Sequence, residues 1–233
     1  MNEIAAFLSE SQSFGLFITL VSFWISSWIY KKTKFVLFAP LLVSCVFVII
    51  TLLVFKVPYE KYLKQADFLY YLMTPVTVAL AIPLYRQFQK LKDNALAIFL
   101  GILGGVFANG IFIFLVCYFF KIGHTEYVSI LPKSITTAIG LALTDQYGGI
   151  QSVTVLLISI AGNLCNIFAV LFCKIFRIRE PVAKGVACGT SGHAMGTSKA
   201  LEMGEIEGAM SGLSIAVTGV LTVIIMPVFV NLI

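Results

Sequence analysis

Four stretches of the chain run for more than 20 residues without a charged side chain, at 35–55, 95–120, 152–173 and 208–233. A helix of about 20 apolar residues crosses the roughly 30 Å hydrocarbon core of a bilayer. Four such segments in a chain of 233 residues cannot all be core helices of one small soluble domain. Charged residues make up 12% of the chain, against roughly 25% in soluble domains. The sequence therefore predicts an all-α polytopic integral membrane protein.

Eight apolar stretches are candidate membrane segments, and the connectors between them are too short to hold a second domain. We expect a single transmembrane domain over residues 1–233, with a scaffold at 14–55 and the core of a substrate site at 68–231. Six to eight segments are expected to enter the membrane, some of them as broken or re-entrant helices. The stretches are 14–30, 35–55, 68–85, 95–120, 132–149, 152–173, 184–200 and 206–231.

The basic residues predict an orientation. They lie beside apolar stretches in clusters at 31–34, 86–92 and 174–184, so the net charge of +5 does not indicate a nucleic-acid partner. Loops rich in Lys and Arg face the cytoplasm, which places the N-terminus outside. All three clusters face the cytoplasm only if 132–149 is re-entrant. We prefer that topology to the alternative in which this stretch spans the membrane.

The third, fifth and seventh stretches differ from the others because they contain prolines or several glycines, which interrupt helices. In lipid, irregular backbone is tolerated only where it is buried in protein or lines a cavity. We therefore expect these three stretches to be discontinuous or re-entrant helices around a central site. The expected hinges are Pro75, Pro83, Gly189 and Gly196.

A weak internal similarity joins two parts of the chain. Thr77 aligns with Thr136 at an offset of 59 residues, and after a small shift Asn109 aligns with Asn166. Such symmetry, with broken helices in corresponding positions, is typical of secondary transporters. The alternative is a chance match between apolar sequences, so it is left open whether the chain contains an internal repeat.

The motif Gly189-Thr190-Ser191-Gly192-His193 is the strongest local signal for a binding site. Glycine followed by hydroxyl side chains just before a helix start aims free N–H groups and hydroxyls at one point. A helix N-terminus of this kind suits an anion such as a carboxylate. His193 could donate a hydrogen bond or accept a proton. The alternative is that the glycines only allow helices to pack closely.

A second helix start is expected at Pro132, with Lys133 and Ser134 after it. Lys133 could attract an anion, although for this residue alone snorkelling to the interface is the simpler interpretation. Asp145 lies in an apolar stretch, where ionisable residues are functional candidates, but the nearby Gly148 also allows a place at the surface.

The remaining candidates are polar side chains within apolar stretches. Asn163 and Asn166 share one face of a helix, where they either join helices or line a cavity. No cofactor is predicted, no catalytic constellation is recognisable, and the cysteines have no metal-ligand spacing. The further candidates for substrate contact are Thr77, Thr136, Thr137 and Thr197.

Taken together, several motifs resemble the LrgB/CidB family over residues 14 to the end. They are Pro132-Lys133-Ser134-Ile135-Thr136-Thr137, Gly189-Thr190-Ser191-Gly192-His193, Lys199-Ala200-Leu201-Glu202-Met203 and Met226-Pro227-Val228. The second motif is more similar to LrgB and the third to CidB, so the subgroup stays open.

The resemblance implies two functions. Members of the family in the bacterial cytoplasmic membrane are described as antiholin- or holin-like. They act with a small LrgA/CidA-like membrane partner on murein hydrolase activity and lysis. The family has also been tied to pyruvate uptake, and its plant relative is the plastidial glycolate/glycerate translocator. We therefore expect a carrier for a small organic acid, as a homo- or hetero-oligomer, with H⁺ or Na⁺ as the open choices for a coupling ion. The alternative is a regulator of lysis without transport of its own.

Overall fold

The computed structural model describes the chain except for residues 1–10, 12, 34–39, 73–74, 76–77 and 80. The chain forms two compact units, Met1–Ala79 and Leu80–Ile233. We describe each by itself. The predicted single domain over 1–233, with its division into scaffold and core, stays a prediction.

The first unit contains four described helices. Its longest helix, α2, agrees with the predicted segment at 14–30, and α3 begins at Pro40, five residues inside the predicted stretch. Helix α2 packs against α3 and α4, and the Gly15 amide donates to Gln65 Oε1 at 3.1 Å. The helices are α2 (Phe14–Thr33), α3 (Pro40–Val54), α4 (Tyr59–Gln65) and α5 (Asp67–Tyr71).

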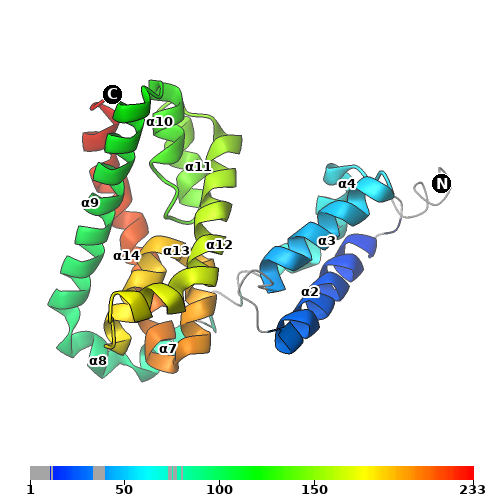
Figure 1. Ribbon diagram of the computed structural model, residues 1–233, viewed down its shortest axis with the longest axis horizontal. Coiled ribbons are helices and arrows are strands. Elements are labelled where there is room, and N and C mark those ends of the chain that lie inside the picture. Colours follow the sequence, from blue (N-terminus) through cyan, green and yellow to red (C-terminus); the bar gives the residue numbers. More distant parts are fainter. Residues whose placement is uncertain (1–10, 12, 34–39, 73–74, 76–77, 80) are drawn as a thin grey trace. The chain divides into compact units, whose positions relative to one another are not determined.

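The second unit contains the remaining helices, and three of them, α9, α12 and α14, are long and apolar enough to cross a membrane (Figure 1). With α2, they make four such helices in the described part of the chain. The predicted all-α polytopic class is confirmed. The helices are α7 (Ala81–Arg86), α8 (Phe88–Asp93), α9 (Ala95–Phe120), α10 (His124–Ile130), α11 (Thr137–Gln146), α12 (Gln151–Ile175), α13 (Pro181–Met203) and α14 (Glu205–Val230).

Helices α10 and α11 form a re-entrant hairpin. The ten residues of α11 rise only about 15 Å, half the thickness of the hydrocarbon core. The turn between the two helices reaches the middle of α9, where Asn109 Nδ2 donates to Leu131 O at 3.2 Å. Near the other end of α11, the hydroxyls of Thr144 and Thr154 lie 2.8 Å apart at the start of α12. The stretch 132–149 thus folds back before it reaches the length of a spanning helix, which agrees with the predicted re-entrant form; its path through the membrane stays a prediction.

Helix α13 is also a hairpin, because its backbone is broken at His193, with φ 42° and ψ −132°. Before the break, Gly189 packs against Ser211 of α14. After it, Thr197 Oγ1 lies 2.7 Å from Ser211 Oγ, and Leu201 packs against Gly208. The first arm thus runs parallel to α14 and the second returns antiparallel. The predicted discontinuity within 184–200 is confirmed, and its tip lies at His193.

The two hairpins enter from opposite ends of the second unit. Figure 1 shows α10 and α11 at the end where the chain terminates, and α7 and α8 at the other end. Ion pairs at 3.9 Å join Arg86 to Glu205 and Lys184 to Glu207, at the start of α14. The basic clusters at 86–92 and 174–184 therefore share one end, as the predicted topology requires. Which side of the membrane this end faces stays a prediction.

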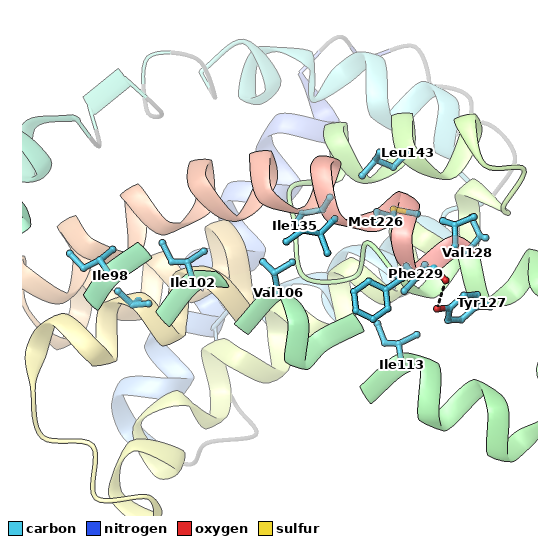
Figure 2. Packing of buried hydrophobic residues seen from close by; sticks show 14 of the residues in the cluster. Ile98, Ile102, Val106, Ile113, Tyr127, Val128, Ile135, Leu143, Met226 and Phe229 are labelled. Carbon is cyan, nitrogen blue, oxygen red and sulfur yellow. Dashed lines mark hydrogen bonds between the residues drawn. The ribbon is translucent and has the colours of Figure 1, made fainter. Parts of the chain in front are cut away.

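A hydrophobic core between α9, α10 and α14 fixes the depth of the first hairpin (Figure 2). Tyr127 is fully buried and its hydroxyl donates to Phe229 O at 2.9 Å. Gly110 of α9 lets the Phe229 ring approach, because a Cβ there would lie 2.6 Å from the ring. These contacts hold α10 between α9 and α14. The turn that follows α10 therefore has a fixed position along these two helices.

Candidate functional site

A cavity of about 590 Å³ lies between α9 and the first arm of α13. It begins near Asn94 and Glu180, at the starts of these two helices, and ends at Asn109 and Lys133. Fifteen helical residues separate Asn94 from Asn109, a rise of about 22 Å. The cavity therefore connects one end of the second unit with the level at which the two hairpins meet.

Lys133 forms the inner end of the cavity. Its Nζ donates to Asn109 Oδ1 at 2.6 Å and to Ser134 Oγ at 3.3 Å, and Ser134 Oγ donates to Asn109 Oδ1 at 3.2 Å. None of the ion pairs among the described residues involves Lys133. A cation at this depth without a carboxylate partner favours an anion beside it.

The structure corrects the predicted helix start at Pro132. Residues 131–135 form turns, with the Lys133 amide donating to Ile130 O at 3.1 Å, and α11 begins five residues later, at Thr137. The chain reverses its direction between α10 and α11, and this reversal needs a turn where the sequence predicted the start of a helix. Snorkelling of Lys133 is also wrong, since its ammonium is bonded to Asn109. Thr136 is the N-cap residue of α11 without a side-chain cap bond. Neither it nor Thr137 lines the cavity.

Thr190 and Ser191 line the cavity opposite Lys133. Thr190 Oγ1 is buried and has no hydrogen-bond partner in the described part of the chain, whereas Ser191 Oγ donates to Ala187 O at 2.6 Å. Contrary to the prediction, neither residue precedes a helix start. Both belong to the last turn of the first arm, because the glycines before them remain helical against α14.

The His193 side chain points to α12 and is buried. Its Nε2 lies 3.0 Å from Ile158 O, and Gly162 gives the ring room, since a Cβ there would lie 2.7 Å from Cε1. His193 does not line the cavity that ends at Lys133. These contacts indicate that the His193 side chain holds the tip of the α13 hairpin against α12. Its predicted role as a donor or proton partner for a substrate stays a prediction.

The backbone of His193 provides a test of that structural assignment. A φ of 42° with this ψ favours glycine. Both His193→Ala and His193→Gly remove the bond to Ile158 O, but only glycine relieves the backbone strain. We expect the Gly variant to be more stable than the Ala variant by about 1 kcal/mol or more, measured by thermal unfolding of the purified protein. Equal stabilities, or a more stable Ala variant, would contradict a strained tip.

The other predicted residues lie outside this cavity. Asn166 Nδ2 donates to Met195 O at 3.0 Å and so joins α12 to the second arm of α13. Asn163 Nδ2 instead donates within its own helix, to Ser159 O. Thr197 binds Ser211, as described above. Asp145 is exposed and accepts a bond from Gln151.

The predicted hinges have different surroundings. Gly189 lies at a close helix contact with Ser211 O, and Gly196 at one with Cys188 O. Gly192 packs against Cys165. The interpretation that the glycines of this motif allow close helix packing therefore holds. Pro75 is exposed in the first unit, and Pro83 lies within α7. Thr77 lies outside the described residues.

Sequence reasoning missed Asn109 as a site residue. It appeared only as a partner in the internal similarity, although an amide in the otherwise apolar 95–120 stretch was itself a signal. Among the residues that the structure describes, no three His, Cys, Asp or Glu side chains gather as metal ligands.

Comparison with known proteins identifies relatives over nearly the whole chain. Residues 19–232 match the model of the LrgB-like family. Antiholin-like protein LrgB of Bacillus subtilis (strain 168) is 37% identical over 224 residues, which are 96% of this chain and 97% of the relative. Antiholin-like protein LrgB of Bacillus cereus (strain B4264) is 36% identical over 217 residues, 93% of this chain and 94% of the relative. No solved structure matches the chain.

Proposed function

Because the chain belongs to the LrgB-like family and is a multi-pass helical protein, we propose that it carries a small monocarboxylate such as pyruvate or glycolate across the membrane. It acts together with an LrgA/CidA-like partner in the bacterial cytoplasmic membrane. The N-terminus lies outside and the basic clusters of the second unit face the cytoplasm, in agreement with the positive-inside rule.

The observation that carries the proposal is the inner end of the cavity. The Lys133 ammonium, the Ser134 hydroxyl and the Thr190 side chain line one space, and Thr190 Oγ1 is buried without a hydrogen-bond partner among the described residues. One cation beside hydroxyl donors matches the charge and hydrogen-bonding needs of one carboxylate. A substrate carboxylate replaces Asn109 as the main partner of Lys133, and a rotation of the Thr190 side chain lets its Oγ1 donate to the same carboxylate. Dicarboxylates fit less well, because their second charge has no cation among the lining residues.

The arrangement of the hairpins supports transport rather than mere binding. The tips of two broken helices meet near the middle of the spanning helices, which is where secondary transporters bind their substrates. Lys133 and Ser191 also line a second cavity, on the α12 side of the first arm of α13. The arm is thus flanked by open space on two sides. If this arm moves sideways, the bound carboxylate becomes open to one of the two cavities and closed to the other.

Transport into reconstituted vesicles tests the proposal. Labelled pyruvate and glycolate are supplied to vesicles that contain the full chain, alone and with its LrgA/CidA-like partner, and uptake is compared with that of empty vesicles. We expect uptake above the empty control and competition by other small monocarboxylates. Uptake that never exceeds the control, with or without the partner and with an imposed H⁺ or Na⁺ gradient, rules out a carrier.

A pair of neighbouring glycines gives a sharper test of the cavity. A Cβ at Gly105 would lie 2.7 Å from Thr190 Cγ2, whereas a Cβ at Gly104 meets nothing within 4 Å. Gly105→Ala therefore displaces Thr190, and we expect uptake to fall by about tenfold or more, since small misplacements at a binding site are costly. Gly104→Ala is the matched control and should keep full uptake. Equal uptake by both variants would remove Thr190 from the site.

The relatives are named antiholin-like, and this favours a second candidate function, an antiholin-like role. In this second proposal the protein regulates murein hydrolase activity and has no transport of its own, as the family resemblance implies. This function depends on surfaces for partners and not on the cavity. A lysis phenotype that persists unchanged after substitution of Lys133 and Thr190 favours the regulator, whereas a phenotype lost in parallel with uptake favours the carrier.

A further inference from the structure

The second cavity is an apolar groove of about 700 Å³ between α12 and the first arm of α13. Its inner end touches Lys133 and Ser134, and its outer end reaches Phe176 and Ile178. Small side chains create the space along its length. Its apolar lining is Leu157, Ile160, Ala161, Leu164, Ala169, Phe172, Phe176, Ile178 and Ala187.

The outer end of the groove continues into a basic pocket. This third cavity, of about 490 Å³, shares Cys173 and Ile178 with the groove. Four cations line it, Lys174, Arg177, Arg179 and Lys184, together with one carboxylate, Glu207. That carboxylate is already 3.9 Å from Lys184. In the described part of the chain, the other three cations have no ion-pair partner.

Arg177, one of the four cations of the basic pocket, occupies a left-handed position at the end of α12. Arg177 lies two residues beyond the end of α12, after the C-cap residue Phe176, and has a φ of 55°. The Ile178 amide donates to Cys173 O at 2.8 Å and the Arg177 amide to Lys174 O at 3.2 Å. This is a Schellman motif, whose left-handed position normally holds glycine. Lys56 and Lys121 have a similar positive φ and the same pair of hydrogen bonds at other helix ends, so the motif itself is a way in which this chain ends helices, and it makes Arg177→Gly a mild substitution for the backbone.

The groove and the pocket lie at different membrane depths. Helix α12 ends at Ile175 and α13 begins at Pro181, so the basic pocket lies at a helix end. The end of a helix that spans a bilayer is where lipid headgroups are expected. Phe172 and Phe176 are exposed and line the outer end of the groove. The groove extends from there toward the hairpin tips, at the level of acyl chains.

We propose that the groove and the basic pocket together bind one anionic phospholipid. The lipid phosphate contacts Lys174, Arg177 and Arg179, and one acyl chain fills the groove along α12. Basic pockets between membrane helices on the cytoplasmic side suit such headgroups. A free phosphate uses only the pocket and leaves the groove empty. The bound chain ends beside Lys133 and Ser191, so lipid occupancy limits how far the first arm of α13 can shift toward α12.

Lipid-dependent thermal unfolding of the full purified chain in a neutral detergent tests this site. The probes are dioleoyl phosphatidylglycerol, dioleoyl phosphatidylcholine and inorganic phosphate. We expect phosphatidylglycerol to raise the Tm by about 5 °C or more, and the other two probes to have little effect. An equal shift with phosphatidylcholine overturns the headgroup assignment. An equal shift with inorganic phosphate overturns the lipid and leaves only an anion pocket.

Two substitutions separate the site from a general attraction of basic proteins to anionic lipid. Arg177→Gly removes a cation and places glycine at the left-handed position. It should therefore raise the Tm without lipid and reduce the shift with phosphatidylglycerol. Ala161→Phe fills the groove and should reduce the same shift without changing any charge. The control, Lys90→Gln with Lys92→Gln, removes two cations of the other cluster at the same end and should keep the full shift.

The outcomes of these variants are decisive in both directions. If Arg177→Gly keeps the full shift, or if the control loses as much as Arg177→Gly, the pocket does not hold the headgroup. If Ala161→Phe does not fold, phosphatidylglycerol retained by the purified wild type and Arg177→Gly is compared by mass spectrometry. Equal retention then overturns the proposal. None of these readouts depends on transport.

Discussion

Replacing Lys133 with Met should lower monocarboxylate uptake by at least about 30-fold, because loss of one partner of a buried charge pair costs about 2–5 kcal/mol. Met keeps the length and the apolar stem of Lys but has no charge. The substituted protein should remain folded, since Lys133 makes hydrogen bonds but no ion pair in the described chain. Initial uptake rates in vesicles at several substrate concentrations measure the effect.

Two further variants identify the cause of the loss. Lys133→Arg keeps the charge and should retain part of the uptake with a weaker apparent affinity, because a guanidinium presents its donors in a different geometry. Lys121→Met removes a cation from the opposite end of α9, away from the cavity, and should leave uptake unchanged. Normal uptake by Lys133→Met would end the proposal that this ammonium binds the substrate. The same holds if Lys121→Met loses as much as Lys133→Met.

Substitution of Gly189 by Ala should give a large loss of stability. Gly189 lies in the seam between the first arm of α13 and α14, where a Cβ would collide with Ser211 O and lie 2.8 Å from Ser214 Cβ. The obstacle is helix backbone, which cannot move aside as a flexible side chain can. Overpacking of this kind costs about 1–3 kcal/mol. We expect the Tm of the purified protein to fall by several degrees.

Gly212 of α14 is the matched control. A Cβ there meets nothing within 4 Å, so Gly212→Ala should instead raise stability by up to about 1 kcal/mol through better helix propensity. The two substitutions make the same chemical change and have opposite expected signs. A Gly189→Ala protein at least as stable as the wild type would contradict the close approach of α13 and α14.

The sequence predicted the elements that depend on local composition. The stretch 95–120 coincides with α9, because a long charge-free segment in lipid can only be a helix. The break within α13 and the re-entrant α11 were also predicted. Their Gly, Pro and hydroxyl residues differ from the clean apolar segments in a way that one sequence can show.

The errors concern the fold-back of the chain, which local composition does not specify. Gly189 stays helical because α14 covers it, and the break falls at His193, in a backbone conformation that favours glycine. The turn that holds Lys133 is placed by contacts made elsewhere, such as that of Tyr127 with Phe229. The partnership of Lys133 with Asn109 joins residues 24 positions apart. Only the tertiary structure brings the two together.

The seam between α13 and α14 has a consequence for biogenesis. The hairpin precedes α14 in the chain, and its glycine-rich arms are not among the helices apolar enough to cross a membrane. During synthesis the hairpin emerges before the helix that covers it, and its polar tip has no stable place in lipid until then. The cavity beside the first arm of α13 should therefore reach its final form late, after α14 is inserted.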